Sequence, residues 1–278
     1  MPRLMSRNGC NDLWKKPVIE ELGLDLLGVG KWECFGSLSM PFVFVFAFFL
    51  AGSHGWWPVS LLCAMGHSFF TYGSISHDLV HRTLRLPVWL NETLLFLIEA
   101  TGFRSGHAYR ATHLNHHQKF PHEDDVEART ATFGLVWTLL DGVVTQPRLW
   151  WWALRNNSGR ARVIVAAEGA VILALLVGCV VAWSYSRLPA AYAALTIAGS
   201  WLFPFITVYI PHNAAGRHAL EHTRWFRGRV LALLALDHLY HLEHHLYPQV
   251  PHQRWATLAK RLAPHLSAQG VKPVVLWK

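Results

Sequence analysis

The chain has 278 residues, of which 52% are hydrophobic and only 15% are charged, and its mean hydropathy is +0.22. A soluble domain of this size usually carries more charge, so the composition argues against an ordinary water-soluble protein and indicates an integral membrane protein. The formal net charge of +8, together with 14 Trp and long apolar runs, favours contact with anionic lipid or an acidic protein over contact with nucleic acid.

Four apolar segments are long enough to cross the hydrocarbon core of a bilayer, which takes roughly 20 helical residues. The first two are joined by the turn GSHGW, and the last two by a turn around Arg187 and Pro189. Each pair is therefore expected to form a helical hairpin. The predicted spans are residues 34–51, 57–76, 163–183 and 190–210.

Two shorter or interrupted apolar segments are interpreted as lying in the membrane interface. Residues 86–102 contain Asn91 and Glu99, which indicates a re-entrant or interfacial segment. Residues 133–154 contain Pro147 and a run of three Trp, a composition typical of a helix at headgroup depth. A true span is the alternative for both segments.

Lysine and arginine concentrate before the first span and after the second, whereas the first hairpin turn has none and the second has only Arg187. Because such residues favour loops that stay in the cytoplasm, both termini, the loop 77–162 and the tail 211–278 are predicted to be cytoplasmic. We expect no cleaved signal peptide. The four isolated cysteines argue against a disulfide framework. The chain 1–278 is thus predicted to be one all-α integral membrane domain, with four transmembrane helices in two hairpins and a cytoplasmic histidine-rich cap.

The most informative feature is the number of histidines, 18 in all, many of them in three clusters. HDLVH follows the second span, and its two histidines share one helical face at i and i+4. HLNHH places three histidines on one face at i, i+3 and i+4. HLYHLEHHLYP follows the fourth span, with histidines at i, i+3 and i+7 on one face. The predicted topology puts all three clusters on the same side of the membrane.

So many imidazoles exceed what one tetrahedral site can use, so two neighbouring metal ions are implied. A further ligand is expected from HNAAGRH, where His212 is favoured over His218. Imidazole suits several metals, but attack on the C–H bond of a hydrocarbon-like substrate needs a redox metal with dioxygen, which favours iron. The carboxylates placed to orient the ligands are Asp78, Asp125, Asp237 and Glu243.

The motifs HDLVH, HLNHH and HLEHH, in this order and topology, resemble those of the membrane fatty-acid desaturase superfamily, which includes acyl-lipid desaturases and carotenoid hydroxylases and ketolases. The resemblance implies a centre of two iron ions, dioxygen as co-substrate, and electrons from ferredoxin or cytochrome b5 through a reductase. An additional histidine before the third motif is expected, which matches His212 or, less well, His218. His238 stays open as a supporting residue or substitute ligand. The other implied ligands are His77, His81, His113, His116, His117, His241, His244 and His245.

The leading hypothesis is a desaturase of fatty-acyl lipid chains, and the alternative is a carotenoid hydroxylase or ketolase. A more distant rival is a metal transporter or sensor, which predicts ionisable residues along the spans. The predicted spans contain few such residues beyond His67 and Glu168, which argues against the rival.

Overall fold

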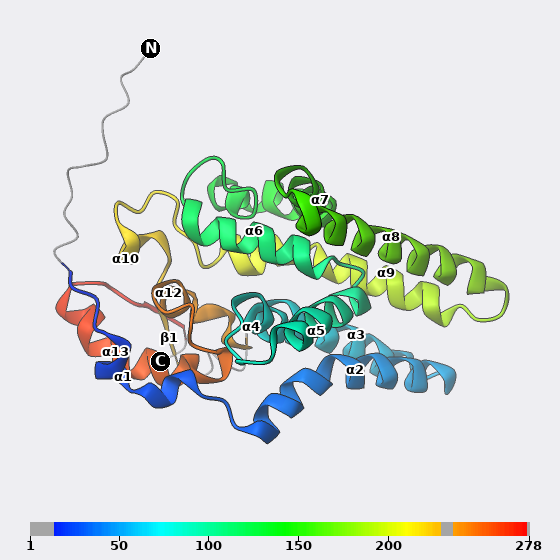
Figure 1. Cartoon of the computed structure of the whole chain (residues 1–278), viewed down its shortest axis with the longest axis horizontal. Coiled ribbons are helices and arrows are strands. Elements are labelled where there is room, and N and C mark those ends of the chain that lie inside the picture. The colour runs from blue at the N-terminus through cyan, green and yellow to red at the C-terminus, as the bar shows by residue number, and fades with distance from the viewer. Residues whose placement is uncertain (1–13, 229–235, 277–278) are drawn as a thin grey trace, which may run out of the picture.

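The structure is a computed structural model that describes residues 14–228 and 236–276. The described chain is mainly helical, as the sequence predicts (Figure 1). The departure is a short parallel pair of strands, β1 (Phe226–Arg227) and β2 (Val274–Val275). Among the described cysteines, Cys34, Cys63 and Cys179 are free, whereas Cys10 lies outside the described residues.

The first hairpin consists of α2 (Lys31–Ser53) and α3 (Trp57–Phe70), which are joined by a turn in which Gly55 has φ +74°. The helical path does not stop at Phe70. A π-helical turn, η2 (Thr71–Ile75), follows directly and leads into α4 (Ser76–His81). This path carries the chain from the hairpin turn to the first histidine motif.

The second hairpin repeats this plan. Helix α8 (Gly159–Val181) continues into a 3-10 turn, η4 (Ala182–Ser184), and the chain returns through α9 (Leu188–Ser200). A second π-helical turn, η5 (Pro204–Tyr209), ends the return path just before His212. The two hairpins lie side by side (Figure 1), and Phe48 of α2 contacts Tyr192 of α9 with ring centroids 5.0 Å apart.

Three helical segments among the described residues are long and apolar enough to cross a membrane: Leu24–Ser53, Gly159–Ser184 and Leu188–Tyr209. They contain the first and third predicted spans and all but the last residue of the fourth. The second predicted span, which comprises α3 and η2, is not among them. The count of four spans therefore stays a prediction.

Between the hairpins lie α5 (Val88–Thr101) and α6 (Gly106–Lys119), of 14 residues each. A helix of this length extends about 21 Å and cannot cross the hydrocarbon core alone, as expected for the segment 86–102. Helix α7 (Leu135–Asn156) follows a 3-10 turn, η3 (Ala128–Thr132), and is not among the three spanning candidates. Whether α5 and α7 lie in the membrane interface stays a prediction.

The remaining elements gather at one end of the molecule, where both ends of the described chain also lie (Figure 1). Apolar side chains of the N-terminal turns and of α13, among them Leu26, Leu258 and Leu262, form one buried core with Leu242 of α12. The elements here are α1 (Ile19–Leu22), η1 (Leu24–Leu27), α10 (Ala219–His222), η6 (Leu236–Leu239), α12 (His241–Leu246), η7 (His252–Arg254) and α13 (Trp255–Ala268).

Candidate metal centre

The nine histidines expected as ligands converge in two neighbouring groups, and each offers one ring nitrogen to its group. Within a group, these nitrogens lie within 4.8 Å of one another. The five-histidine group consists of His77, His81, His113, His117 and His244. The four-histidine group consists of His116, His212, His241 and His245.

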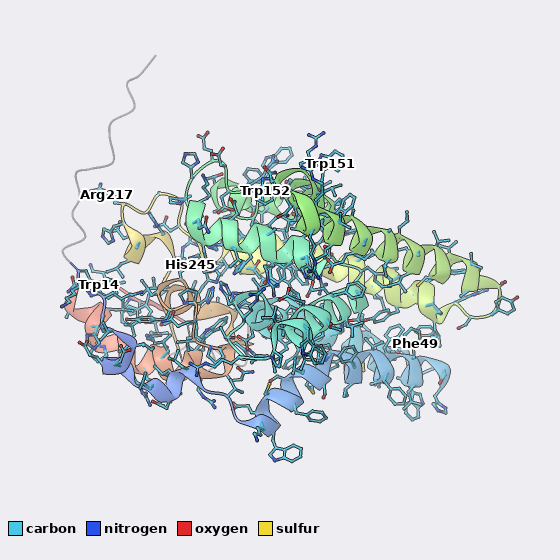
Figure 2. The ribbon with its side chains drawn as sticks, in the orientation of Figure 1. Trp14, Phe49, Trp151, Trp152, Arg217 and His245 are labelled. Carbon is cyan, nitrogen blue, oxygen red and sulfur yellow. The ribbon has the colours of Figure 1, made fainter. Side chains whose placement is uncertain are left out.

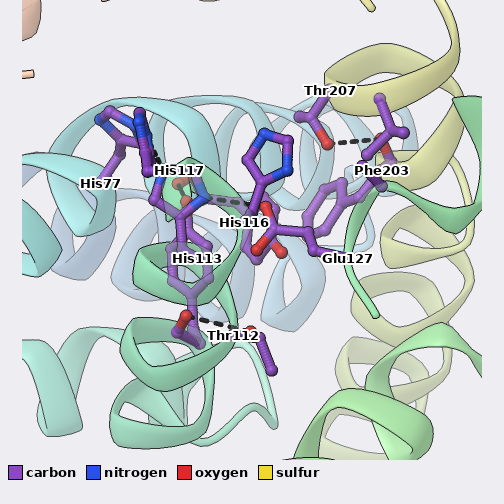
Figure 3. A network of polar contacts seen from close by, with 12 residues as sticks. His77, Thr112, His113, His116, His117, Glu127, Phe203 and Thr207 are labelled. Atoms are coloured by element: carbon purple, nitrogen blue, oxygen red, sulfur yellow. Dashed lines mark hydrogen bonds and ion pairs between the residues drawn. The ribbon is translucent and has the colours of Figure 1, made fainter. Parts of the chain in front are cut away.

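Four separate elements bring these residues together. Helix α4 presents the two histidines of the first motif at i and i+4, and α6 presents the three of the second motif, with the neighbours His116 and His117 pointing to different groups (Figure 3). Helix α12 divides its histidines in the same way, because His244 belongs to one group and His245 to the other. His212 joins them from the segment that follows η5.

The five-histidine group is joined through Nε2 atoms. The Nε2 of His244 lies 3.0 Å from that of His77 and 2.8 Å from that of His117. The Nε2 of His117 in turn lies 3.1 Å from that of His113. The buried Nε2 of His81 has no hydrogen-bond partner among the described residues, and its ring centroid lies 4.7 Å from that of His77.

The four-histidine group forms a closed ring of Nε2 atoms. His116 lies 2.9 Å from His212, which lies 3.0 Å from His241. His241 lies 3.0 Å from His245, and His245 lies 3.2 Å from His116. Two imidazole nitrogens bound at right angles to one metal ion, each at about 2.1 Å, are about 3.0 Å apart. The spacing of the group therefore fits a shared metal ion.

The hydrogen bonds that His116 and His212 make at Nδ1 show that their Nε2 atoms face one another as lone-pair acceptors without a proton. His116 donates from Nδ1 to Asp125 Oδ2 at 2.6 Å, and His212 donates from Nδ1 to the carbonyl of Val208 at 2.9 Å. A neutral imidazole has one N–H, so the Nε2 atoms of both rings are acceptors. Two acceptors 2.9 Å apart repel each other unless a cation lies between them. The donor set thus fits bound metal.

Burial lowers the pKa of histidines in both groups, which keeps their rings neutral near physiological pH. Loss of hydration lowers the pKa of His81 to about 4 and that of His117 to about 2. The pKa values of His113, His212 and His245 lie well below the ordinary value, again because burial disfavours the charged imidazolium. Neutral imidazole is the form that binds a metal ion, so the site needs no prior loss of protons.

Two carboxylates orient histidines of the site. Asp125 accepts from His116, as the sequence predicts, and Glu127 Oε1 accepts from His113 Nδ1 at 2.8 Å (Figure 3). Glu127 was not expected from the sequence, because it lies in the irregular segment after α6. Its signal was the acidic run EDDVE after the second motif.

The other carboxylates considered have different partners. Asp78 accepts from the ring of His252 at 2.6 Å, and Glu243 accepts from Arg227 at 2.9 Å. Neither carboxylate contacts a histidine of the two groups through these bonds, so the expected role belongs to Asp125 and Glu127 instead. The side chain of Asp237 lies outside the described residues.

The remaining candidate histidines lie outside both groups. His238 is buried against Phe69, with ring centroids 6.2 Å apart, and beside Gly73 of η2. The Nε2 of His218 is 3.5 Å from the carboxylate of Glu221 in a partly exposed pair. The structure therefore places His212, and neither alternative, among the grouped nitrogens.

The fold and the site together define a helical protein with membrane-spanning candidates and two adjoining histidine groups suited to metal ions. The chain belongs to the fatty acid desaturase family, whose sequence model matches residues 54–277. Comparison with curated proteins gives no match. The family implies a membrane-associated, oxygen-dependent oxidoreductase that acts on lipid, and the matched range includes all nine grouped histidines.

Proposed function

We propose that each histidine group holds one iron ion and that the protein uses dioxygen to desaturate a fatty-acyl chain. The observation that carries the proposal is the pair of bare Nε2 atoms of His116 and His212, 2.9 Å apart. Bound iron would supply the one-electron redox chemistry that activates dioxygen against an unactivated C–H bond. Zinc could not support the oxidation of a hydrocarbon, because it has no redox chemistry.

The chain itself contributes ligand orientation and an apolar surrounding. Asp125 and Glu127 fix the tautomers of His116 and His113, so that both rings turn Nε2 toward their groups. Trp255 packs against the rings of His77 and His244, with centroids 5.3 and 5.2 Å away. Such packing keeps bulk water from one side of the five-histidine group.

Space for an apolar chain lies beside the helices that carry the ligands. A small cavity of about 90 Å³ lies between α3 and α9, next to both π-helical turns, and its lining includes Met65, Tyr72, Phe203 and His238. Since η2 leads to His77 and η5 leads to His212, this cavity shows that apolar space lies close to the elements that carry the ligands. This position supports a lipid substrate.

The reaction also needs electrons from outside the chain. We propose a separate donor, such as ferredoxin or cytochrome b5 with its reductase, that docks on the cytoplasmic side. The formal charge of +8 favours an acidic partner, since opposite charges speed the encounter of two proteins.

The test combines metal analysis with dioxygen-dependent lipid profiling of the purified protein. His244→Ala removes a nitrogen from the five-histidine group and His241→Ala removes one from the four-histidine group, so each variant is expected to lose about one iron of two. The double variant should lose both irons and all new unsaturated lipids. His265→Ala, on the exposed part of α13, is the control.

Three outcomes would contradict parts of the proposal. Zinc in place of iron, or unchanged lipids with iron present, would overturn the oxidase and revive a metal-binding protein. Hydroxylated or ketolated pigment in a carotene-producing host, with acyl chains unchanged, would replace the acyl substrate by a carotenoid.

A further inference from the structure

A second and larger cavity, of about 450 Å³, lies between α6, α7, α8 and α9. Its lining is mostly apolar, with Leu149, Trp150, Ile172 and Leu176 among its residues. A size of this order suits a drug-sized or lipid-like ligand. We call it the α6–α9 cavity.

The α6–α9 cavity adjoins the candidate metal centre. Tyr109 of α6 lines the cavity and contacts the ring of His113, with centroids 5.5 Å apart. Tyr109 also stacks on Tyr72 at 4.2 Å, and Tyr72 stacks on Phe203 at 4.3 Å. These stacked rings separate the α6–α9 cavity from the small cavity between α3 and α9, which Tyr72 and Phe203 also line.

One charged side chain lines this apolar space. Arg104 is 3% exposed and is held on one edge by Glu99, which accepts from Nε at 2.7 Å and from Nη2 at 3.4 Å. Its guanidinium lies over the rings of Tyr72 and Phe203, at 5.5 and 5.1 Å from their centroids. It also packs closely on Gly102, where an added Cβ would lie 2.6 Å from the guanidinium carbon.

These contacts leave the buried Nη1 group of Arg104 without a hydrogen-bond partner among the described residues. A buried N–H without a partner is costly, and native proteins rarely leave one unless a ligand or water completes it. A guanidinium that lines an apolar cavity and has a buried nitrogen without a partner in the described chain is suited to bind an oxygen atom of a ligand.

The net charge of the Glu99–Arg104 pair restricts which chemical class of ligand can bind. Glu99 already neutralises Arg104, so a carboxylate brought to Nη1 would be a second, uncompensated negative charge in a buried site. An uncharged carbonyl or hydroxyl oxygen avoids this cost and still accepts the hydrogen bond. The rest of the ligand must be apolar, as the cavity lining is.

We propose that the α6–α9 cavity binds the lipid substrate and that Arg104 Nη1 donates a hydrogen bond to an uncharged oxygen of that lipid. This inference rests on the proposed function, since it names the class of its substrate. Two sources carry this chemistry: an acyl chain with an alcohol or ester oxygen, and an oxygenated carotenoid. A free fatty acid and a plain hydrocarbon do not fit.

Binding is measured on the full-length, iron-free protein in detergent by the change in intensity and wavelength of tryptophan fluorescence, because Trp150 lines the cavity. The probes are a long-chain alcohol and the alkane of equal length, then a hydroxylated carotenoid and its parent hydrocarbon. We expect the oxygenated member of at least one pair to bind about 10- to 100-fold more tightly. The probe pair in which the oxygenated member binds more tightly shows whether the ligand is an acyl lipid or a carotenoid. The ionised fatty acid should show no such gain.

The variant Glu99→Gln/Arg104→Gln removes both charges together, so no buried charge is left unpaired. It should abolish the preference for the oxygenated probe while keeping the affinity for the hydrocarbon. The matched control is Asp141→Asn/Arg148→Gln, which neutralises another bidentate pair, on α7, and should keep the preference.

Equal binding of alcohol and alkane and of both carotenoids would overturn the proposal and leave water as the partner of Nη1. A preference that survives in the Glu99→Gln/Arg104→Gln variant would overturn it as well. Neither result depends on iron or turnover, so failure here is distinct from failure of the proposed oxidase.

Discussion

At the scale of single residues, two rings of the four-histidine group, His116 and His212, are oriented by hydrogen bonds at Nδ1. Asp125 is buried, and it both accepts from His116 and binds the backbone N–H groups of Glu127 and Ala128 through Oδ1. One carboxylate thus fixes the ring of a candidate ligand and the loop that carries the second orienting carboxylate.

Asp125→Asn tests this orienting role. Asparagine can keep one acceptor for the loop, but it is uncharged and weakens the bond to His116. We expect iron affinity to fall by about 10- to 100-fold, as is typical when an orienting partner of a ligand is lost. The measurement is the iron content per chain after dialysis against a chelator. The control is Asp124→Asn, a change at the exposed neighbouring residue. Equal iron retention in both variants would contradict the role.

Sequence reasoning identified the nine grouped histidines because eight of them lie in three motifs that resemble those of a known family, and because His212 lies just after the fourth predicted span. Helical spacing alone would have grouped His238 with His241 and His245, which the structure does not do.

The roles of Glu127 and Arg104 were not predicted from the sequence, and the reason is physical. Glu127 lies beyond α6 in a loop, and Arg104 lies in the turn between α5 and α6, so no periodicity predicts what either side chain meets. Their partners, His113 and Glu99, are known only from the folded structure.

At the scale of elements, both returning helices contain a π-helical turn just ahead of a candidate ligand, η2 before His77 and η5 before His212. Such turns are rare and often occur at functional sites. Apolar periodicity predicts a helix but not a local change in its winding. The sequence therefore predicted these helices without predicting how they turn their last residues toward the candidate metal centre.

Gly73 in η2 makes room for His238, since a Cβ added there would overlap the imidazole ring. Gly73→Ala is expected to lower the free energy of unfolding by about 1–3 kcal/mol through overpacking. It should also lower iron content, because η6, which carries His238, leads directly into the histidines of α12. Thermal unfolding and metal analysis check both effects.

The matched control for this change is Gly178→Ala in α8, where an added Cβ meets no described atom within 4 Å. Alanine in a helix interior is favoured over glycine by roughly 0.5–1 kcal/mol, so this variant should be as stable as the parent or slightly more so. If both variants behaved alike, close packing at Gly73 would not be what holds η6.

At the scale of the whole molecule, the N-terminal segment closes over the third histidine motif. Lys16 donates to the carbonyl of Leu246 at 2.8 Å, and the hydroxyl of Tyr247 donates to the carbonyl of Pro17 at 2.7 Å. The sequence suggested that the tail after His212 could fold as a cap. It did not predict that the N-terminal segment packs against this tail, because contacts between residues 230 positions apart leave no local pattern in the sequence.

The orientation of the molecule in the membrane is a prediction that labelling can check. In a variant whose four cysteines are replaced, single cysteines are placed at His54, Tyr185, Glu123 or Lys272, all exposed. The first two mark the hairpin turns, and the last two mark the loop and tail expected in the cytoplasm. On intact cells, a membrane-impermeant maleimide should label only the hairpin turns, because positively charged segments remain inside.

After permeabilisation, the cysteines at Glu123 and Lys272 should become reactive as well, which shows that the sites are accessible in the folded protein. Labelling of Glu123→Cys in intact cells would place the loop after α6 outside, and with it the histidine groups. A soluble cytoplasmic electron donor could not then reach them. The same experiment thus decides the orientation and restricts the source of electrons.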